Sequence, residues 1–164
     1  MTVLEKLLLL YYFVIGNILG RLLYPKSIFQ SCYFSRPGSK GWSWISKCII
    51  SQKIFGYNRS VPWPCSPLIQ IIEPCNIKFH PDDLNNFMTA GCYYQAIGRI
   101  VIGKGCFIAP NVGLITQNHD LNDPFKRGEI KEIILGEKCW IGMNSLILPG
   151  VKLGPHTVVG GVVL

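Results

Sequence analysis

The chain has 164 residues, of which 49% are hydrophobic, and its mean hydropathy of +0.30 is high for a small soluble domain. The length suits one domain with an appendage, and the hydropathy suggests membrane contact. Seven cysteines include no C-x-x-C pair, so neither a zinc ribbon nor a redox motif is indicated. We expect buried, reduced thiols.

The net charge lies entirely in the first half of the chain. Residues 1–80 hold nine Lys or Arg against Glu5 and Glu73, which gives +7, whereas residues 81–164 hold seven of each sign. Such asymmetry points to an anionic partner, either a membrane face or nucleic acid, and the alternative is a solvated basic face without a partner. With the apolar segment described next, we expect a membrane face and no nucleic acid.

Residues 1–25 form an apolar segment with helical spacing that Pro25 would end. Only 14 uncharged residues lie between Lys6 and Arg21, fewer than the roughly 20 that a transmembrane helix needs, and no small-x-small cleavage site follows. We therefore predict a helix lying in the membrane interface. The alternatives are a helix packed on the protein's own core or a sister subunit, and a spanning or signal segment.

Residues 26–80 are rich in Ser, Trp, Pro and Cys and contain turn signals. We interpret them as an irregular connecting region. The remaining residues, 81–164, are predicted to form the third segment and the main domain.

From Ile102 the sequence repeats every six residues, and the repeat is interrupted after His119 and resumes at Leu135. The first position of each repeat is aliphatic: Ile102, Ile108, Leu114, Leu135, Ile141, Ile147, Leu153 and Val159. The second position is Gly or Ala in six of the eight repeats. Periods of 3.6 or 2 do not give this pattern, whereas short strands joined by tight corners and stacked into a solenoid do.

The rhythm breaks after His119, because Leu114 and Leu135 are 21 residues apart, which is not a multiple of six. A loop at residues 120–134 is therefore predicted to leave the scaffold. His119 lies at its base, and histidine is suited to removing a hydroxyl proton near neutral pH. We interpret His80 and His156 as surface residues, and Asn118 as occupying an inward fifth position of its repeat.

The segments "IAPNV", "NHD", "CWIG" and "ILPGV…LG" occur in the order found in the hexapeptide-repeat acyltransferases, and the chain resembles this family. The closest likeness is to polysaccharide and sugar O-acetyltransferases. The resemblance implies a mainly β fold, a left-handed parallel β-helix shaped as a three-sided prism, here with an apolar N-terminal α-helix. It also implies acetyl-CoA as donor, no metal, and a homotrimer whose active site lies between two subunits.

The resemblance also assigns roles to individual residues. His119 matches the general base, and the backbone N–H of Met143 matches the group that faces the developing oxyanion. Four residues match positions along coenzyme A: Trp140, Gly142, Gly160 and Gly161. Three more are expected to bind substrate or support the site: Asn118, Asp120 as a loop anchor, and Asn86 in place of the family's sugar-binding asparagine.

The predicted function is acetyl-CoA-dependent O-acetyl transfer to a sugar hydroxyl, or to a lipid-linked glycan, in capsule or O-antigen biosynthesis. The predicted location is the cytoplasm, peripheral at the inner membrane face. Serine O-acetyltransferase is one alternative. Because the sequence ends with "VVGGVVL" where the family continues into a closing coil, a non-catalytic trimeric scaffold without a complete coenzyme A site is another. A carbonic-anhydrase relative would need three histidines around a metal, and only His119 is suitably placed.

Overall fold

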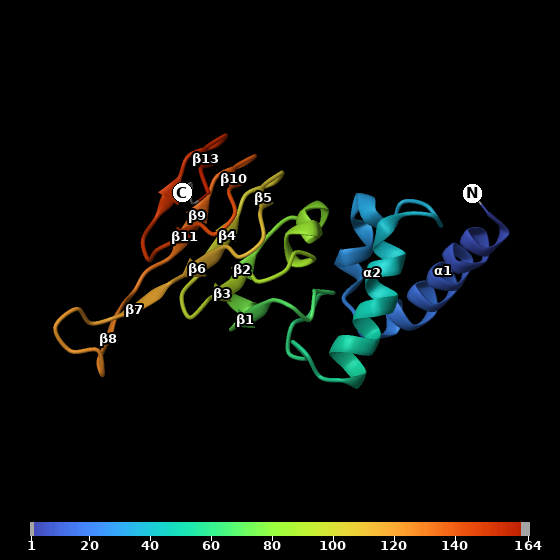
Figure 1. The fold of residues 1–164 in the computed structure, drawn as a ribbon, viewed down its shortest axis with the longest axis horizontal. Coiled ribbons are helices and arrows are strands. Elements are labelled where there is room, and N and C mark those ends of the chain that lie inside the picture. Colours follow the sequence, from blue (N-terminus) through green and yellow to red (C-terminus); the bar gives the residue numbers. More distant parts are fainter. Residues whose placement is uncertain (1, 162–164) are drawn as a thin grey trace. The chain divides into compact units, whose positions relative to one another are not determined.

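The structure, a computed structural model, describes residues 2–161. The chain divides into two compact units, Met1–Pro67 and Leu68–Leu164. The first is helical and the second consists mainly of parallel β-strands (Figure 1). The division also separates the charge: the first unit carries eight basic residues and Glu5, hence +7, and the second carries eight of each sign.

The first unit begins with α1, Val3–Leu23. A reciprocal capping box starts it, in which Glu5 N donates to Thr2 Oγ1 (3.2 Å) and Thr2 N donates to the Glu5 carboxylate (2.8 Å). The helix ends where Tyr24 turns extended ahead of Pro25, because a residue before proline avoids the helical region. The predicted helix is thus confirmed, and its predicted place in a membrane stays a prediction.

α1 packs on α2, Lys40–Cys48, through a narrow glycine face. A Cβ at Gly16 would lie 2.7 Å from Ile45 Cγ2, and one at Gly20 would lie 2.9 Å from Ile45 Cδ1. Ser46 Oγ also donates to the Tyr12 carbonyl (3.0 Å). The alternative that the helix packs on the protein itself therefore holds for this glycine face of α1.

The other faces of α1 are exposed and apolar. Its exposed large hydrophobic residues are Val3, Leu4, Leu7, Leu8, Leu10, Tyr11, Val14, Ile18, Leu19, Leu22 and Leu23. With 21 residues and a mean hydropathy of 1.6, α1 is long and apolar enough to cross a membrane, a test that a signal sequence also passes. Counting only the 14 residues between charges underestimated its length, because Glu5, Lys6 and Arg21 lie within the helix.

The segment predicted to be irregular holds further helices: η1 (Lys26–Gln30), η2 (Cys32–Phe34), α2, and a π-helical turn η3 (Ile49–Ile54). Trp42 is buried at their centre, with its ring centroid 5.1 Å from Phe13 and 5.0 Å from Phe34. These helices are too short to show an apolar period, and aromatic packing rather than helix propensity holds them.

Gln52 joins these helices to the segment that follows them. Its side chain is fully buried. Its Oε1 accepts from Tyr24 Oη (2.9 Å) and Cys65 N (3.2 Å), and its Nε2 donates to the carbonyls of Asn58 and Trp63 (both 3.2 Å). A buried amide with both ends bonded fixes the loop against the helices at little desolvation cost.

The second unit contains three parallel sheets. Sheet 1 has β1 (Gln70–Ile72), β3 (Tyr93–Gln95), β6 (Gly113–Ile115) and β11 (Leu146–Ile147). Sheet 2 has β2 (Ile77–Lys78), β4 (Ile100–Ile102), β9 (Ile133–Leu135) and β12 (Lys152–Leu153), and sheet 3 has β5 (Phe107–Ile108), β10 (Trp140–Ile141) and β13 (Val158–Val159). From β3 onward the chain visits sheets 1, 2 and 3 in turn, so each turn stacks on the one before (Figure 1).

The six-residue repeat sets this geometry. Ile141 pairs with Val159, 18 residues later, so three repeats make one turn. The first-position side chains from Ile102 to Ile147 are buried, whereas Leu153 and Val159 near the end are half-buried. At the corners backbones stack so closely that a Cβ at Gly142 would lie 2.4 Å from Gly161 N, which explains the small second position. The last fifth position, Val163, lies outside the described residues.

The cysteines are all free, but only five are buried. Cys32 and Cys75 are exposed, so the expectation of burial is wrong for these two, which lie on short 3-10 helices (η2 and η4, Pro74–Asn76) at the surface. Cys106 fits the expectation: its Sγ donates to the Gly136 carbonyl (3.0 Å), and burial raises its pKa to about 11.

The parallel strands begin at Gln70, before the predicted domain boundary at residue 81. The first turn lacks a strand in sheet 3 and has η5 (Pro81–Phe87) near β5 instead. Asp83 accepts from Gly105 N (2.9 and 3.1 Å) in the turn before β5. The six-residue pattern is missing from this first turn, because side-chain hydrogen bonds to the turn before β5 replace the pairing of one strand with another.

A hairpin interrupts the coil between β6 and β9. Its strands, β7 (Gln117–His119) and β8 (Arg127–Ile130), are antiparallel, and Lys131 N donates to the Thr116 carbonyl (2.9 Å) at its base. The predicted loop of residues 120–134 is thus displaced: the chain leaves the coil at Gln117, and β9 has rejoined sheet 2 by Ile133.

Candidate active site

A groove with a volume of about 570 Å³ lies where the hairpin leaves the coil. Most of its lining residues are polar, and they come from the hairpin and from the sheet 1 side of the coil. The lining residues are Ile72, Glu73, Asn76, Tyr93, Gln95, Ile97, Gln117, Asn118, His119 and Arg127. The structure thus places His119 in a cavity, at the interruption that the sequence pattern identified.

His119 is exposed on β7, and its ring orientation is fixed by one hydrogen bond. Nδ1 lies 2.6 Å from the Pro124 carbonyl oxygen. A carbonyl can only accept, so Nδ1 carries the proton of the neutral ring. Nε2 is then left with its lone pair, which is the state that a general base requires.

Asp120 shapes the turn that carries Pro124. Its Oδ1 accepts from Asn122 N (2.9 Å) and Asp123 N (3.1 Å), and its own N donates to the Lys126 carbonyl (3.0 Å). These bonds confirm Asp120 as a loop anchor. It acts on His119 only indirectly, by holding the turn from which the Pro124 carbonyl projects.

Asn118 lines the groove and is exposed, so its predicted inward position is wrong. The repeat ends earlier than its spacing suggests, because the chain turns out of the coil at Gln117. Thr116 takes the buried corner instead: its Oγ1 donates to the Gln95 carbonyl (2.6 Å) and accepts from Gly98 N (2.9 Å).

Asn86 is not a groove residue, so its predicted role in binding the acceptor is wrong. Its side chain is buried, with Nδ2 donating to the Cys106 carbonyl (3.0 Å) and Oδ1 accepting from Ile108 N (2.9 Å). The amide thereby completes the hydrogen bonds of β5 where no neighbouring strand exists.

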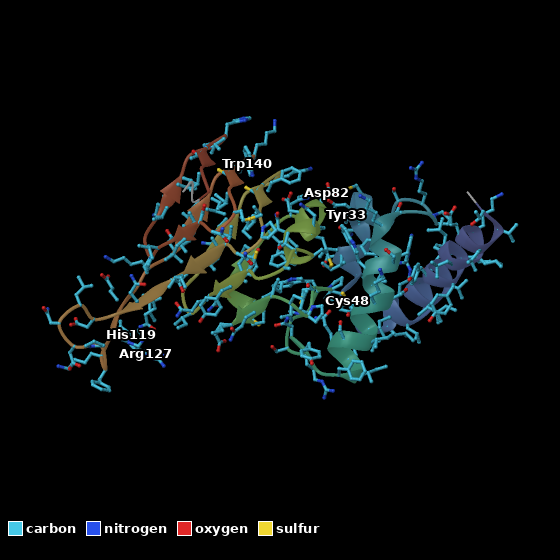
Figure 2. The ribbon with its side chains drawn as sticks, in the orientation of Figure 1. Tyr33, Cys48, Asp82, His119, Arg127 and Trp140 are labelled. Carbon is cyan, nitrogen blue, oxygen red and sulfur yellow. The ribbon has the colours of Figure 1, made fainter. Side chains whose placement is uncertain are left out.

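The residues expected to bind coenzyme A lie elsewhere on the second unit. Trp140 is exposed on sheet 3, in register with the exposed Phe107 and Val158. Figure 2 shows Trp140 well away from His119. Within one chain, therefore, the predicted base and the predicted donor site are not brought together.

Met143 and the glycines belong to the same part of the coil as Trp140. Gly142 and Gly161 are needed for close stacking, since a Cβ at Gly161 would lie 2.6 Å from Met143 O. Among residues 2–161, a Cβ at Gly160 would meet nothing within 4 Å, so packing against this part of the chain does not require the glycine. Close packing of the backbone therefore explains the glycines at positions 142 and 161 without any cofactor.

Sequence reasoning missed Arg127 and Glu73. Arg127 is the cross-strand partner of His119 on the hairpin, and both residues are labelled in Figure 2. Glu73 follows β1 with a left-handed backbone (φ 52°) and lines the groove. Neither lies in a repeat, and only the antiparallel register could have paired Arg127 with His119.

Among residues 2–161, no three His, Cys, Asp or Glu side chains gather as metal ligands would.

Known proteins resemble the coil and its surroundings. A putative acetyltransferase of Schizosaccharomyces pombe is 32% identical over 111 residues, 66% of this chain and 52% of the relative. A putative acetyltransferase of Dictyostelium discoideum is 40% identical over 106 residues, 62% of this chain and 53% of the relative. The galactoside O-acetyltransferase of Escherichia coli (strain K12) is 38% identical over 64 residues, 37% of this chain and 32% of that enzyme.

The resemblance to acetyltransferases is confirmed. The chain spans about half the length of the first two relatives. No family model matches it. No solved structure matches it either.

Proposed function

We propose that the protein is an acetyl-CoA-dependent O-acetyltransferase that acts on a sugar hydroxyl in surface polysaccharide biosynthesis. The observation that carries this proposal is His119, which lines the groove and whose Nδ1 is bonded to a carbonyl, while Nε2 makes no hydrogen bond to any residue from 2 to 161. The named relatives, one of them a galactoside O-acetyltransferase, support the reaction and the class of acceptor.

The reaction is a direct transfer. Nε2 of His119 takes the proton of the acceptor hydroxyl while that oxygen bonds to the acetyl carbonyl carbon. The backbone N–H of Met143 stabilises the oxyanion, and the Pro124 carbonyl stabilises the imidazolium through Nδ1–H. The C–S bond then breaks, the thiolate takes the proton from Nε2, and the products are an acetyl ester and coenzyme A.

No covalent enzyme intermediate is needed, because donor and acceptor meet in one site. Two cysteines would otherwise compete for the role of nucleophile, Cys106 and Cys139. Both thiols are buried and donate to carbonyl oxygens, Cys106 to Gly136 (3.0 Å) and Cys139 to Gly154 (3.2 Å). Burial also raises the pKa of Cys106, which leaves almost no thiolate there at neutral pH.

The active form is a homotrimer of left-handed coils with one site at each subunit interface. The separation of His119 from Trp140 within one chain supports this assembly, since His119 of one subunit would meet Trp140 and Met143 of the next. Two apolar side chains near the hairpin tip, Leu121 and Phe125, are 99% and 100% exposed. A threefold ring of identical contacts would cover them.

The helical unit holds the enzyme peripherally on the cytoplasmic face of the inner membrane, where lipid-linked glycans are accessible. Its +7 charge attracts anionic headgroups, and the exposed apolar faces of α1 enter the interface. Charge and apolar burial then act together, as stable peripheral binding requires.

The test is acceptor-dependent release of coenzyme A thiol by the purified chain, with acetyl-CoA and either 4-nitrophenyl galactoside or L-serine. The proposal predicts release with the sugar and not with serine. Release with serine alone would favour a serine O-acetyltransferase. Failure to bind acetyl-CoA in a binding titration would favour a non-catalytic scaffold.

A further inference from the structure

We propose that the groove selects an acceptor carrying an anionic group, a carboxylate or a phosphate, and that Arg127 is the residue that binds it. This inference rests on the proposed function, because it concerns the acceptor side of the same site. It assigns a specificity role to a residue outside the repeat pattern.

The first observation is position. Arg127 is the direct cross-strand partner of His119 on the hairpin, and both residues line the groove. Direct partners in an antiparallel pair have Cβ atoms roughly 5 Å apart on the same face. A group held by Arg127 would therefore lie beside the hydroxyl at His119 Nε2, a spacing that the substituents of one sugar ring can match.

The second observation is that the guanidinium has no partner within the described part of the chain. Two lysines of the hairpin and its base are paired: Lys126 with Asp123 (3.3 Å) and Lys131 with Glu129 (3.0 Å). Arg127 makes no ion pair or side-chain hydrogen bond among residues 2–161, although Glu73 lines the same groove. Five unused donors in a fixed fork suit bidentate binding of a carboxylate or phosphate.

The rest of the lining suits a sugar. Glu73, Tyr93, Gln95 and Asn118 bring acceptors and donors for hydroxyl groups. An acidic sugar would thus place its hydroxyls on these side chains and its charge on Arg127. A neutral sugar would leave the guanidinium without a partner.

The test measures binding and turnover with three probes: glucuronate, glucose 1-phosphate and glucose. We expect the wild-type chain to bind one or both anionic probes more tightly than glucose. Arg127→Gln should weaken anionic binding by about tenfold or more, the usual loss for a charge-assisted hydrogen-bonded pair, and leave glucose unchanged. The affinity of Arg127→Lys for the anionic probes should fall between those of the wild type and Arg127→Gln. Comparing glucuronate with glucose 1-phosphate then separates carboxylate recognition from phosphate recognition.

The matched control is Lys126→Gln, which removes the same charge from the same hairpin at a side chain that does not line the groove. It should change none of the Kd values. Equal binding of all three probes by the wild type, or a rise in the acetyl-CoA KM of Arg127→Gln with anionic binding unchanged, would overturn the inference. Anion binding that depends on Arg127 without any acetyl transfer would instead retain this inference and contradict the proposed function.

Discussion

At the scale of single residues, one hydrogen bond decides which nitrogen of His119 carries the proton of the neutral ring. The Pro124 carbonyl accepts a hydrogen bond from Nδ1–H, and Asp120 holds the turn that presents this carbonyl. The chemistry of His119 therefore depends on a residue that does not touch it. Preorganised support of this kind is what a catalytic side chain on a hairpin needs.

Asp120→Ala should lower kcat about tenfold, because two turn hydrogen bonds are lost and the imidazole is no longer held. KM for acetyl-CoA should not change. Asp120→Asn keeps an acceptor oxygen and should restore most of kcat. Steady-state kinetics of the two variants check this, and an Asn variant as impaired as the Ala variant would show that the charge itself matters.

The sequence predicted His119 because it ends the last repeat before the break. It could not predict Arg127, because no pattern along the chain specifies the register of a hairpin that forms only in space. Asn118 was misplaced for the same reason, since counting by six continues past the point where the chain leaves the coil.

At the scale of elements, the coil and α1 were predictable and the helices after α1 were not. Aliphatic side chains at the first position of every repeat are buried only if successive turns stack with these side chains inside, as Ile108 and Ile141 do. The helices after α1 depend on a single tryptophan, Trp42, surrounded by aromatic rings, and on the buried Gln52. Such contacts join residues that are distant in the sequence, so they produce no periodic pattern along it.

Asn86→Ala should destabilise the coil by about 2–4 kcal/mol, because it leaves Ile108 N and the Cys106 carbonyl buried without partners. Asn85→Ala is the control, since its side chain makes only a 3.5 Å contact with Asn86, and it should cost less than about 0.5 kcal/mol. Denaturant unfolding measures both. A raised acceptor KM with unchanged stability in Asn86→Ala would restore its role in binding.

Gly16→Ala should destabilise the helical unit by about 1–2 kcal/mol, because the new methyl group meets the Trp42 carbonyl oxygen at 3.0 Å as well as Ile45. Gly20→Ala meets only the Ile45 side chain, whose tip can move, and a helix favours alanine by up to about 1 kcal/mol. We expect it to be nearly neutral. Thermal unfolding followed by circular dichroism in detergent compares the two, and equal losses would contradict the asymmetry.

At the scale of the whole molecule, charge and exposed apolar surface are divided unequally between the two units. The helical unit carries the entire net charge and the exposed apolar helix, and the neutral β unit carries the groove. The sequence indicated this separation through its charge asymmetry, although it placed the boundary at residue 81 instead of at Leu68.

Replacing three exposed residues of α1 together, Leu7→Gln, Leu10→Gln and Val14→Gln, should reduce binding to anionic vesicles by at least about tenfold, because each removes apolar surface. Thermal stability should not change, since none of the three is buried. Vesicle cosedimentation is the measurement, and high salt should release the wild type only partly. Complete release of the wild type by salt would show that charge alone binds it.

The proposed active site joins His119 of one subunit to Trp140 of the next. The most direct measurement is the activity of mixed trimers formed from His119→Ala and Trp140→Ala chains, assayed below the acetyl-CoA KM. His119→Ala alone should lose roughly 10²–10⁴-fold in kcat, and Trp140→Ala alone should bind the donor weakly. Random mixing at equal amounts should restore about a quarter of wild-type activity, because each mixed ring contains one intact site of three. If mixing restores nothing while the two variants form mixed trimers, each site belongs to a single chain, which contradicts a site shared between subunits.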